Sequence, residues 1–177
     1  MAIIGNYSPD DYTVIISVPG TNFLHRITGF SEGTFISLER LVPTSTPYQG
    51  VGEKSVGRVK RKITSMSAAI SLSQISSSNS VLQALQAADA DDSTSNQWVF
   101  ACTVSDLSGT HKVSTNTAII QAPATKAFAD TMGTRDWQIH MFDSVEEGGG
   151  NMLLSDQEVT AIEATGRTVD PRWTVAG

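Results

Sequence analysis

Three histidines are the side chains in this 177-residue sequence best suited to acid–base or metal chemistry. His25, His111 and His140 are separated by tens of residues, and none has another His, Cys or acid at the spacing of a metal-ligand pair. Serine is so abundant that its coexistence with His and Asp does not indicate a nucleophile. We therefore expect no catalytic residue and no metal site.

A glycine-rich segment comes close to a phosphate-binding loop. Gly52 and Gly57 have the required spacing, but Arg58-Val59 stands where Lys-Ser/Thr is needed. The segment also follows the loop residues 43–50 and not a buried strand, so a strand–loop–helix cradle cannot form. A flexible loop accounts for the glycines better, and no cofactor is expected.

The single cysteine, Cys102, excludes an intrachain disulfide. It follows the apolar residues 98–101, which predicts a buried, inert thiol, with a reactive thiol as the alternative. No apolar run approaches the roughly 20 residues of a membrane helix, and the N-terminus lacks the pattern of a secretory signal. We expect a cytoplasmic product with no membrane partner.

Charge is distributed unevenly along the chain. The net charge is −6, but residues 1–62 carry seven Lys and Arg against five Asp and Glu, whereas residues 63–177 carry five against thirteen. An acidic chain argues against a protein that binds nucleic acid by neutralising phosphates. The basic run at Arg58, Lys60, Arg61 and Lys62 therefore needs another explanation, and a solvated charge run is the simplest one.

Hydrophobic periodicity predicts a mainly β fold with enough apolar residues for one core. The expected architecture is an antiparallel β-sandwich or partly rolled barrel with one helix and a long extended hairpin loop. The helix is predicted over residues 78–90. Strands are predicted over residues 12–18, 23–27, 34–42, 64–73, 97–105, 110–121 and 135–143.

Two of these strands separate polar from apolar side chains. One parity should pack into the core together with the helix residues Val81, Leu82 and Leu85. Its strand members are Ile36, Leu38, Met66, Ala68, Ile70 and Leu72. The other parity is small, neutral or acidic, and consists of Ser37, Glu39, Ser65, Ser67, Ala69, Ser71 and Ser73.

The last 26 residues allow several structures. Ser155–Glu158 fits a capping box, and Gly166 could end a short helix. A strand through Val159–Ala164 is nearly as plausible. Low apolar content and the preceding glycines also fit a C-terminal extension that docks on a neighbour through Trp173. We favour this last possibility.

Six segments occur in an order and spacing that resemble the tail tube proteins of tailed bacteriophages, most closely those of contractile tails. They are Gly33–Pro43, Arg58–Lys62, Ser65–Ser73, Ser76–Leu85, Gly133–Trp137 and Gly148–Asn151. The resemblance covers roughly the first 150 residues. It implies a tail tube β domain over 1–151, followed by a C-terminal extension over 152–177 on which it is silent.

The resemblance implies a structural subunit of the virion tail, assembled in the host cytoplasm, with no enzymatic activity. Hexameric rings would share a closed inner β-barrel and stack into a tube that conducts the genome during ejection. The implied partners are other copies of the chain, a tail sheath protein outside, the tape measure protein and passing DNA in the lumen, and tube initiator and terminator proteins. A related tube-like baseplate or neck protein and a generic β-sandwich binding module are the alternatives.

Two surfaces are expected to serve such an assembly. The small polar parity should line the lumen, because it offers no cation to hold passing phosphates, although it could instead face outer solvent. Loop 43–62 should reach an adjacent subunit, mainly in the next ring. Its expected contact residues are Gly50, Gly52, Gly57, Arg58, Lys60, Arg61 and Lys62, opposite Asp89, Asp91, Asp92 and residues 146–147.

Overall fold

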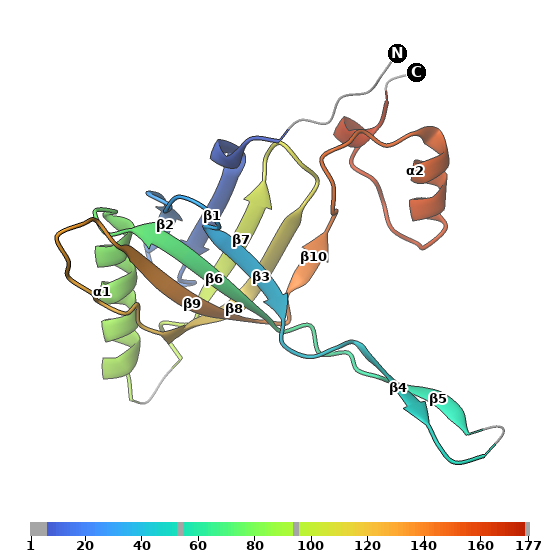
Figure 1. Ribbon diagram of the computed structural model, residues 1–177, viewed down its shortest axis with the longest axis horizontal. Helices are drawn as coiled ribbons and strands as arrows, with labels where there is room; N and C mark the ends of the chain where they lie inside the picture. Colours follow the sequence, from blue (N-terminus) through green and yellow to red (C-terminus); the bar gives the residue numbers. More distant parts are fainter. Residues whose placement is uncertain (1–6, 53–54, 94–95, 176–177) are drawn as a thin grey trace. The chain divides into compact units, whose positions relative to one another are not determined.

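Residues 7–52, 55–93 and 96–175 are described by the computed structural model of this chain (Figure 1). They group into two compact units. The larger unit consists of Val14–Thr103 and Ser114–Val145. The smaller unit consists of the residues up to Thr13, Val104–Val113 and the residues from Glu146 onward. The domain boundary after residue 151 stays a prediction.

Eight strands hydrogen-bond into one continuous sheet, in the order β2-β1-β7-β8-β9-β6-β3 with β10 paired to β8. They are β1 Tyr12–Ser17, β2 Leu24–Ile27, β3 Ile36–Arg40, β6 Met66–Ser73, β7 Phe100–Asp106, β8 Lys112–Ala122, β9 Thr134–Phe142 and β10 Val145–Glu147. The prediction of a mainly β fold is confirmed. Within the described residues the sheet does not close into a barrel, and β2 and β3 each have one strand neighbour.

Alternation along β6 decides which of its side chains enter the core. The residues of one parity expose 3% of their surface or less, whereas the residues between them are half-buried. The buried members are Met66, Ala68, Ile70 and Leu72, as predicted. Ile36 and Leu38 share this face but are only half-buried, because β3 is the edge strand of the sheet.

Helix α1, Ser78–Asp91, covers the apolar face of the larger unit. Leu82 and Leu85 are buried as predicted, while Val81 is half-buried. The Asn79 side chain ties the first turn to the sheet. Its amide donates to the Ser73 carbonyl at 2.9 Å, and its oxygen accepts from the buried Trp137 indole at 3.0 Å. The helix is thereby fixed to both β6 and β9.

The segment predicted to be a flexible loop is a second, two-stranded sheet. Strands β4, Ser45–Gln49, and β5, Val56–Lys60, pair antiparallel, and Gly50 donates to the Ser55 carbonyl at 2.7 Å beside the turn. All ten residues of the two strands are exposed. Figure 1 shows this hairpin, hereafter the arm, extending beyond the ends of β3 and β6. The predicted long extended hairpin is thus confirmed, whereas its description as a flexible loop was wrong, because cross-strand pairing orders the arm without a buried face.

The tail folds locally in the smaller unit. Helix α2, Asp156–Glu163, starts at the predicted capping box, where the Ser155 amide donates to the Glu158 carboxylate at 2.8 Å. Gly166 follows it with a positive φ of 79°. Because α2 occupies this part of the chain, the alternative strand through Val159–Ala164 is wrong. A parallel bridge between Leu154 and Thr174 closes the segment. The described residues therefore form two α-helices, where one was predicted.

The glycines before the tail are pinned in place and do not form a free hinge. The Thr110 side chain accepts from the Gly149 and Gly150 amides at 3.1 and 3.3 Å, and Asn151 donates to the Asp106 carboxylate at 3.0 Å. Gly148 has φ of 74°, and an added Cβ would lie 1.9 Å from the Thr110 carbonyl oxygen. Glycine is required at this close approach.

Asp106 holds Asn151 and the turn after β7 together. It is 5% exposed and accepts from the Ser108 amide and hydroxyl at 2.9 and 2.8 Å. Burial by itself would raise the pKa of Asp106, but the hydrogen bonds from Ser108, Asn151 and Tyr12 outweigh it and hold the pKa below its ordinary value. The ionised carboxylate therefore fastens residue 151 to the turn after β7.

Among the described residues, none of the helices is both long and apolar enough to cross a membrane.

Candidate assembly surfaces

The three histidines lie in unrelated surroundings. His25 Nε2 lies 2.9 Å from the Ser78 hydroxyl, His111 Nε2 lies 3.6 Å from a Glu146 carboxylate oxygen, and the His140 ring contacts Phe142. Burial lowers the pKa of His25. Ser78 is fully buried and also accepts from the Thr28 amide, so it is a structural hydroxyl. Across the described ranges, His, Cys, Asp and Glu nowhere gather in a group of three that could hold a metal ion.

One pattern of a catalytic serine does occur, at Gly29–Gly33, with Ser31 at its centre. A nucleophile of that type stands on a sharp turn between a strand and a helix. Here the segment connects β2 to β3, and the Ser31 amide donates to the Ser71 carbonyl at 2.9 Å. The described contacts of His25, His111 and His140 are with Ser78, Glu146 and Phe142, so they do not join any of these histidines to Ser31 as a general base. The segment is therefore an extension of the sheet edge and not a nucleophile site.

The small polar parity forms one continuous face across three strands, hereafter the polar face. Register places Ser37 beside Ala69 and Glu39 beside Ser67 on β3 and β6. On the other side of β6, Ser71 pairs with Asp136. Ser65 lies one residue before β6, and its carbonyl accepts from the Leu41 amide at 3.2 Å. The predicted residues are thus brought together on a single surface, and their role in a lumen stays a prediction.

Strand β9 adds residues to the polar face that the sequence reasoning did not assign to it. Register aligns them with the serines and alanine of β6, and the Ser71 hydroxyl donates to the Asp136 carboxylate. They are Thr134, Asp136, Gln138 and His140. The alternation with Trp137, Ile139 and Met141 was visible in the sequence. The partner strand was not, because it lies more than sixty residues away.

The polar face carries no lysine or arginine on β3, β6 or β9. The two arginines of these strands, Arg40 and Arg135, belong to the opposite parity. Glu39 and Asp136 supply the negative charge, and the remaining side chains are small or neutral apart from His140. Such a surface cannot form a phosphate-neutralising track.

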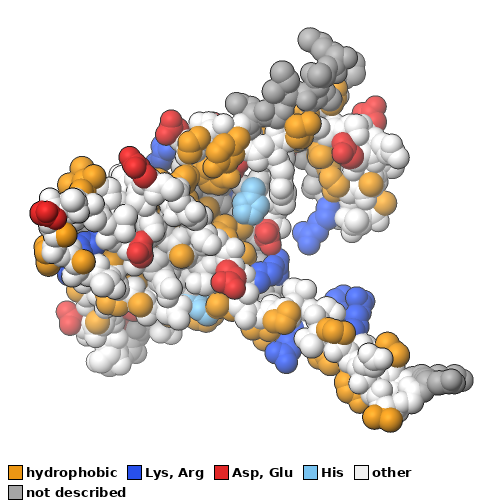
Figure 2. All heavy atoms as spheres, in the orientation of Figure 1, with side chains coloured by type: hydrophobic (Ala, Val, Ile, Leu, Met, Phe, Trp, Pro, Cys, Tyr) orange, Lys and Arg blue, Asp and Glu red, His pale blue; other side chains and the backbone are white. Residues whose placement is uncertain are grey.

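The arm has two different faces. Register puts Arg58 opposite Pro47 and Lys60 opposite Ser45 on one face, and Val59 opposite Thr46 on the other. Tyr48, on the face of Val59, is opposite Gly57 and is 59% exposed. Figure 2 shows hydrophobic and basic side chains gathered along the arm. The basic run is therefore split between faces.

Among the described residues, Arg58, Lys60, Arg61 and Lys62 form no ion pair within the chain, and all four are exposed. Of the predicted acidic partners, Asp91 is exposed at the end of α1, and Asp92 accepts from the Gln97 amide at 3.3 Å. Glu146 lies beside His111. Pairing between copies stays a prediction.

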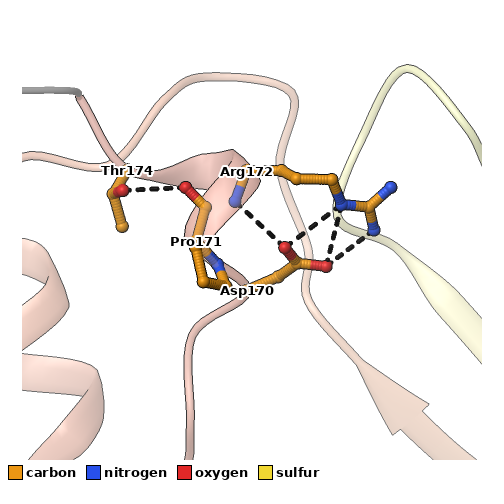
Figure 3. A network of polar contacts seen from close by, with 4 residues as sticks. All are labelled: Asp170, Pro171, Arg172 and Thr174. Carbon is orange, nitrogen blue, oxygen red and sulfur yellow. Dashed lines mark hydrogen bonds and ion pairs between the residues drawn. The ribbon is translucent and has the colours of Figure 1, made fainter.

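Trp173 is partly covered within its own unit. It lies in the short helix η2, Pro171–Trp173, and its carbonyl accepts from the Leu154 amide at 2.6 Å. Arg172 beside it is paired with Asp170, with contacts of 3.1, 3.0 and 2.6 Å (Figure 3). Hydrogen bonds from Arg172 lower the pKa of Asp170. Docking of Trp173 on a neighbour would use only its remaining exposed surface.

The chain is 34% identical over 167 residues to the structural protein ORF10 of Pseudomonas phage KPP10, covering 94% of this chain and 95% of that protein. No family model matches the chain. A chain of the anti-feeding prophage baseplate has the same fold, with a TM-score of 0.53, 11% identity and coverage of 84% of this chain and 98% of that one. A chain of the cap that terminates the anti-feeding prophage tube has a TM-score of 0.47, with 9% identity and coverage of 84% and 95%.

Proposed function

We propose that this chain, which belongs to the family of the phage structural protein ORF10, is the repeating subunit of a phage tail tube. A structural family agrees with the expectation that the chain is not an enzyme. In the proposed assembly, hexameric rings stack into a hollow tube of the virion tail, which forms in the host cytoplasm and conducts the genome during ejection.

The observation that carries this proposal is the polar face on an open-edged sheet. Strands β3, β6 and β9 present small, neutral or acidic side chains on one side and a packed core on the other. DNA is densely anionic, and every Lys or Arg contact to a phosphate would add affinity and slow its passage. A wall built from the polar face would let DNA slide without binding.

Ring closure is proposed through the edges of the sheet. Strands β2 and β3 are its terminal strands, and each leaves one side of its backbone without a strand partner in the described residues. Unpaired edges favour pairing with another chain. Repeating this contact around a ring would complete an inner barrel and bury the edges, which explains why the isolated subunit has no closed barrel.

The arm is proposed to join successive rings. It extends from the body of its unit and exposes apolar and basic side chains. The charges of the arm would select the register between two rings and raise their association rate. Added salt would weaken these ionic contacts. A tail sheath protein outside, tape measure protein in the lumen, and initiator and terminator proteins at the tube ends complete the proposed set of partners.

Electron microscopy of the purified protein tests the proposal. We expect hollow tubes or stacked rings, with a cryo-EM map that places Ser67, Ala69 and Asp136 on the inner wall. A map that puts these side chains on the outer wall would reject the lumen assignment. A protein that stays monomeric at every concentration would reject the tube itself.

A second candidate is a related tube-like protein of the baseplate or neck. The fold shared with a chain of the anti-feeding prophage baseplate favours considering it, although a shared fold does not determine a role. The same micrographs separate the two candidates, because such a protein would form a single closed ring and would not extend into long tubes.

A further inference from the structure

We infer that the end of the β6–β9 pair farthest from the arm is the acceptor surface for the arm of a second copy of this chain. This surface, hereafter the acceptor end, consists of Ile75 and the loop of residues 123–133, with Phe128 and Met132. The inference rests on the proposed tube and goes beyond it by naming where the arm docks and through which side chains.

The arm and the acceptor end lie at opposite ends of the same strand. The arm is inserted between Arg40 of β3 and Met66 of β6, which are paired. Strand β6 then runs to Ser73, which pairs with Thr134, the first residue of β9. With a rise of roughly 3.3 Å per residue, about 23 Å separate the two ends of β6. A contact from one end to the other therefore requires a second copy.

Three large apolar side chains are exposed at the acceptor end. Ile75 is 81% exposed, Phe128 82% and Met132 68%. An exposed apolar side chain occurring singly needs no explanation, but a group at one end of a strand pair indicates an interaction site. Burying such side chains would contribute roughly 25 cal/mol per Å² of apolar surface removed from water.

Hydrogen bonds hold this surface in place. The Gln74 amide donates to the Gly133 carbonyl, and the Gly133 amide donates to the Gln74 side chain, both at 3.1 Å. Arg135 donates to the Thr125 carbonyl at 3.1 Å, and its guanidinium carbon lies 5.3 Å from the Phe128 ring centre. Arg135 itself is 8% exposed and anchors the loop. The acceptor end is thus shaped before any partner arrives.

The arm offers a matching surface. Within β4 and β5, the face with Thr46, Tyr48 and Val59 carries no charge, and Arg61 follows on the same side only beyond the end of β5. Gly57 leaves the space beside Tyr48 open. Val59 is 52% exposed, and Val51 near the turn is fully exposed. Apolar side chains of the arm can therefore cover those of the acceptor end, while Arg58 and Lys60 point to the other face.

Charge favours another copy of this chain as the occupant. Residues 43–62 hold five of the twelve Lys and Arg but one of the eighteen Asp and Glu, so their net charge is +4 and that of the remaining residues is −10. Asp130 lies within the acceptor end and Asp136 lies beside it, and the exposed Lys126 is the cation of the same loop. A cationic arm is attracted to the anionic body of any other copy.

The symmetry of this contact is head-to-tail. A donor at one end of the strands and an acceptor at the other form a heterologous interface, which leaves a free donor and a free acceptor after each addition. Such an interface repeats without limit along one direction. It accounts for the stacking of rings, whereas the sheet edges account for their closure.

Cysteine cross-linking tests the contact directly. Cys102 is fully buried, and burial raises the pKa of its thiol to about 12, so it will not compete for the reagent. Val59→Cys marks the arm, and Met132→Cys marks the acceptor end. Ala90→Cys marks the acidic end of α1, the other site to which a basic arm could be attracted. The variants are mixed in pairs, assembled and treated with a short bis-maleimide.

We expect covalent dimers from Val59→Cys mixed with Met132→Cys, and none from Val59→Cys mixed with Ala90→Cys. Tubes that form normally but cross-link only through Ala90→Cys, or through neither site, would overturn the acceptor assignment and leave the proposed function standing. If neither rings nor tubes form from the unmodified chain, the proposed function fails, and this inference fails with it.

A substitution at the acceptor end gives a second readout. Phe128→Ser should raise the critical concentration for tube growth by about tenfold, equivalent to roughly 1.4 kcal/mol, while single rings still form. Leu107→Ser is the matched control, because Leu107 is 63% exposed in the turn after β7 and belongs to the smaller unit, whereas the arm and the acceptor end belong to the larger one. Equal critical concentrations for the two variants, at unchanged subunit melting temperature, would contradict the inference.

Discussion

Replacing Leu72 with alanine should destabilise the subunit strongly, because this side chain is fully buried in the core of the larger unit. Leu72 is fully buried on the core parity of β6, between the bridged Phe30 on one side and Arg135 of β9 on the other. Strands on both sides prevent the backbone from collapsing onto the vacated space. Truncation of a buried Leu costs about 2–5 kcal/mol, which is a large fraction of the stability of an ordinary domain.

The expected change is measurable by thermal unfolding. In a protein of this size each kcal/mol lowers the melting temperature by roughly 2–4 °C, so Leu72→Ala should melt about 4–20 °C below the parent. Circular dichroism at a subunit concentration below that of assembly avoids a contribution from the tube. Poor solubility and little assembly should accompany the loss.

Ser67→Ala is the control for this measurement. It removes a single oxygen from the polar face of the same strand and should change the free energy of unfolding by no more than about 0.5 kcal/mol. If Leu72→Ala melted with the parent and assembled normally, the assignment of the core to this parity of β6 would be wrong.

Three further predictions concern charge and the tail. Reversing the charge of Lys60, Arg61 and Lys62 by substitution with Glu should slow or abolish tube growth while leaving the subunit folded. Growth of the parent tubes at the same rate across a salt series would argue against ionic contacts. Asp106→Asn should lower stability at pH 7 and flatten its pH dependence in urea titrations. The folded pKa of Asp106 is depressed, so the parent loses this contribution as the pH falls below about 3.8 and through the folded value, and equal profiles for both proteins would refute the role. Deleting 152–177 should alter stacking but leave a cooperatively melting subunit, since no residue of α2 is buried; complete unfolding by circular dichroism would contradict this.

Sequence periodicity determined the β6 assignment because one face of that strand is buried on folding. A two-residue alternation appears wherever a strand separates core from water, and β6 and β9 both show it. The arm has no buried face, and its strands show no such alternation. All residues of β4 and β5 are exposed, so no alternation marked these two strands, and the sequence predicted an extended hairpin without them.

In the tail, too, contacts between residues close in sequence could be predicted, whereas contacts with residues far away in the chain could not. The capping box of Ser155 and Glu158 joins residues three positions apart, so it could be predicted from the sequence and was confirmed. The glycines before the tail, in contrast, do not act as a free hinge, because Gly148 is required by the carbonyl of Thr110 and Asn151 is held by Asp106. Those partners lie about forty residues earlier in the chain.

The polar face could also be predicted only in part from the sequence. The sequence by itself determined that the serines of β6 share one side of a strand, because their spacing of two residues is a local property. Only the tertiary structure decided that Asp136 joins Ser71 on that side and that the arginines of the three strands are turned away. The register between β6 and β9 joins residues more than sixty positions apart, and the indole of Trp137 on β9 donates to Asn79 of α1, so no short window of sequence contains both partners.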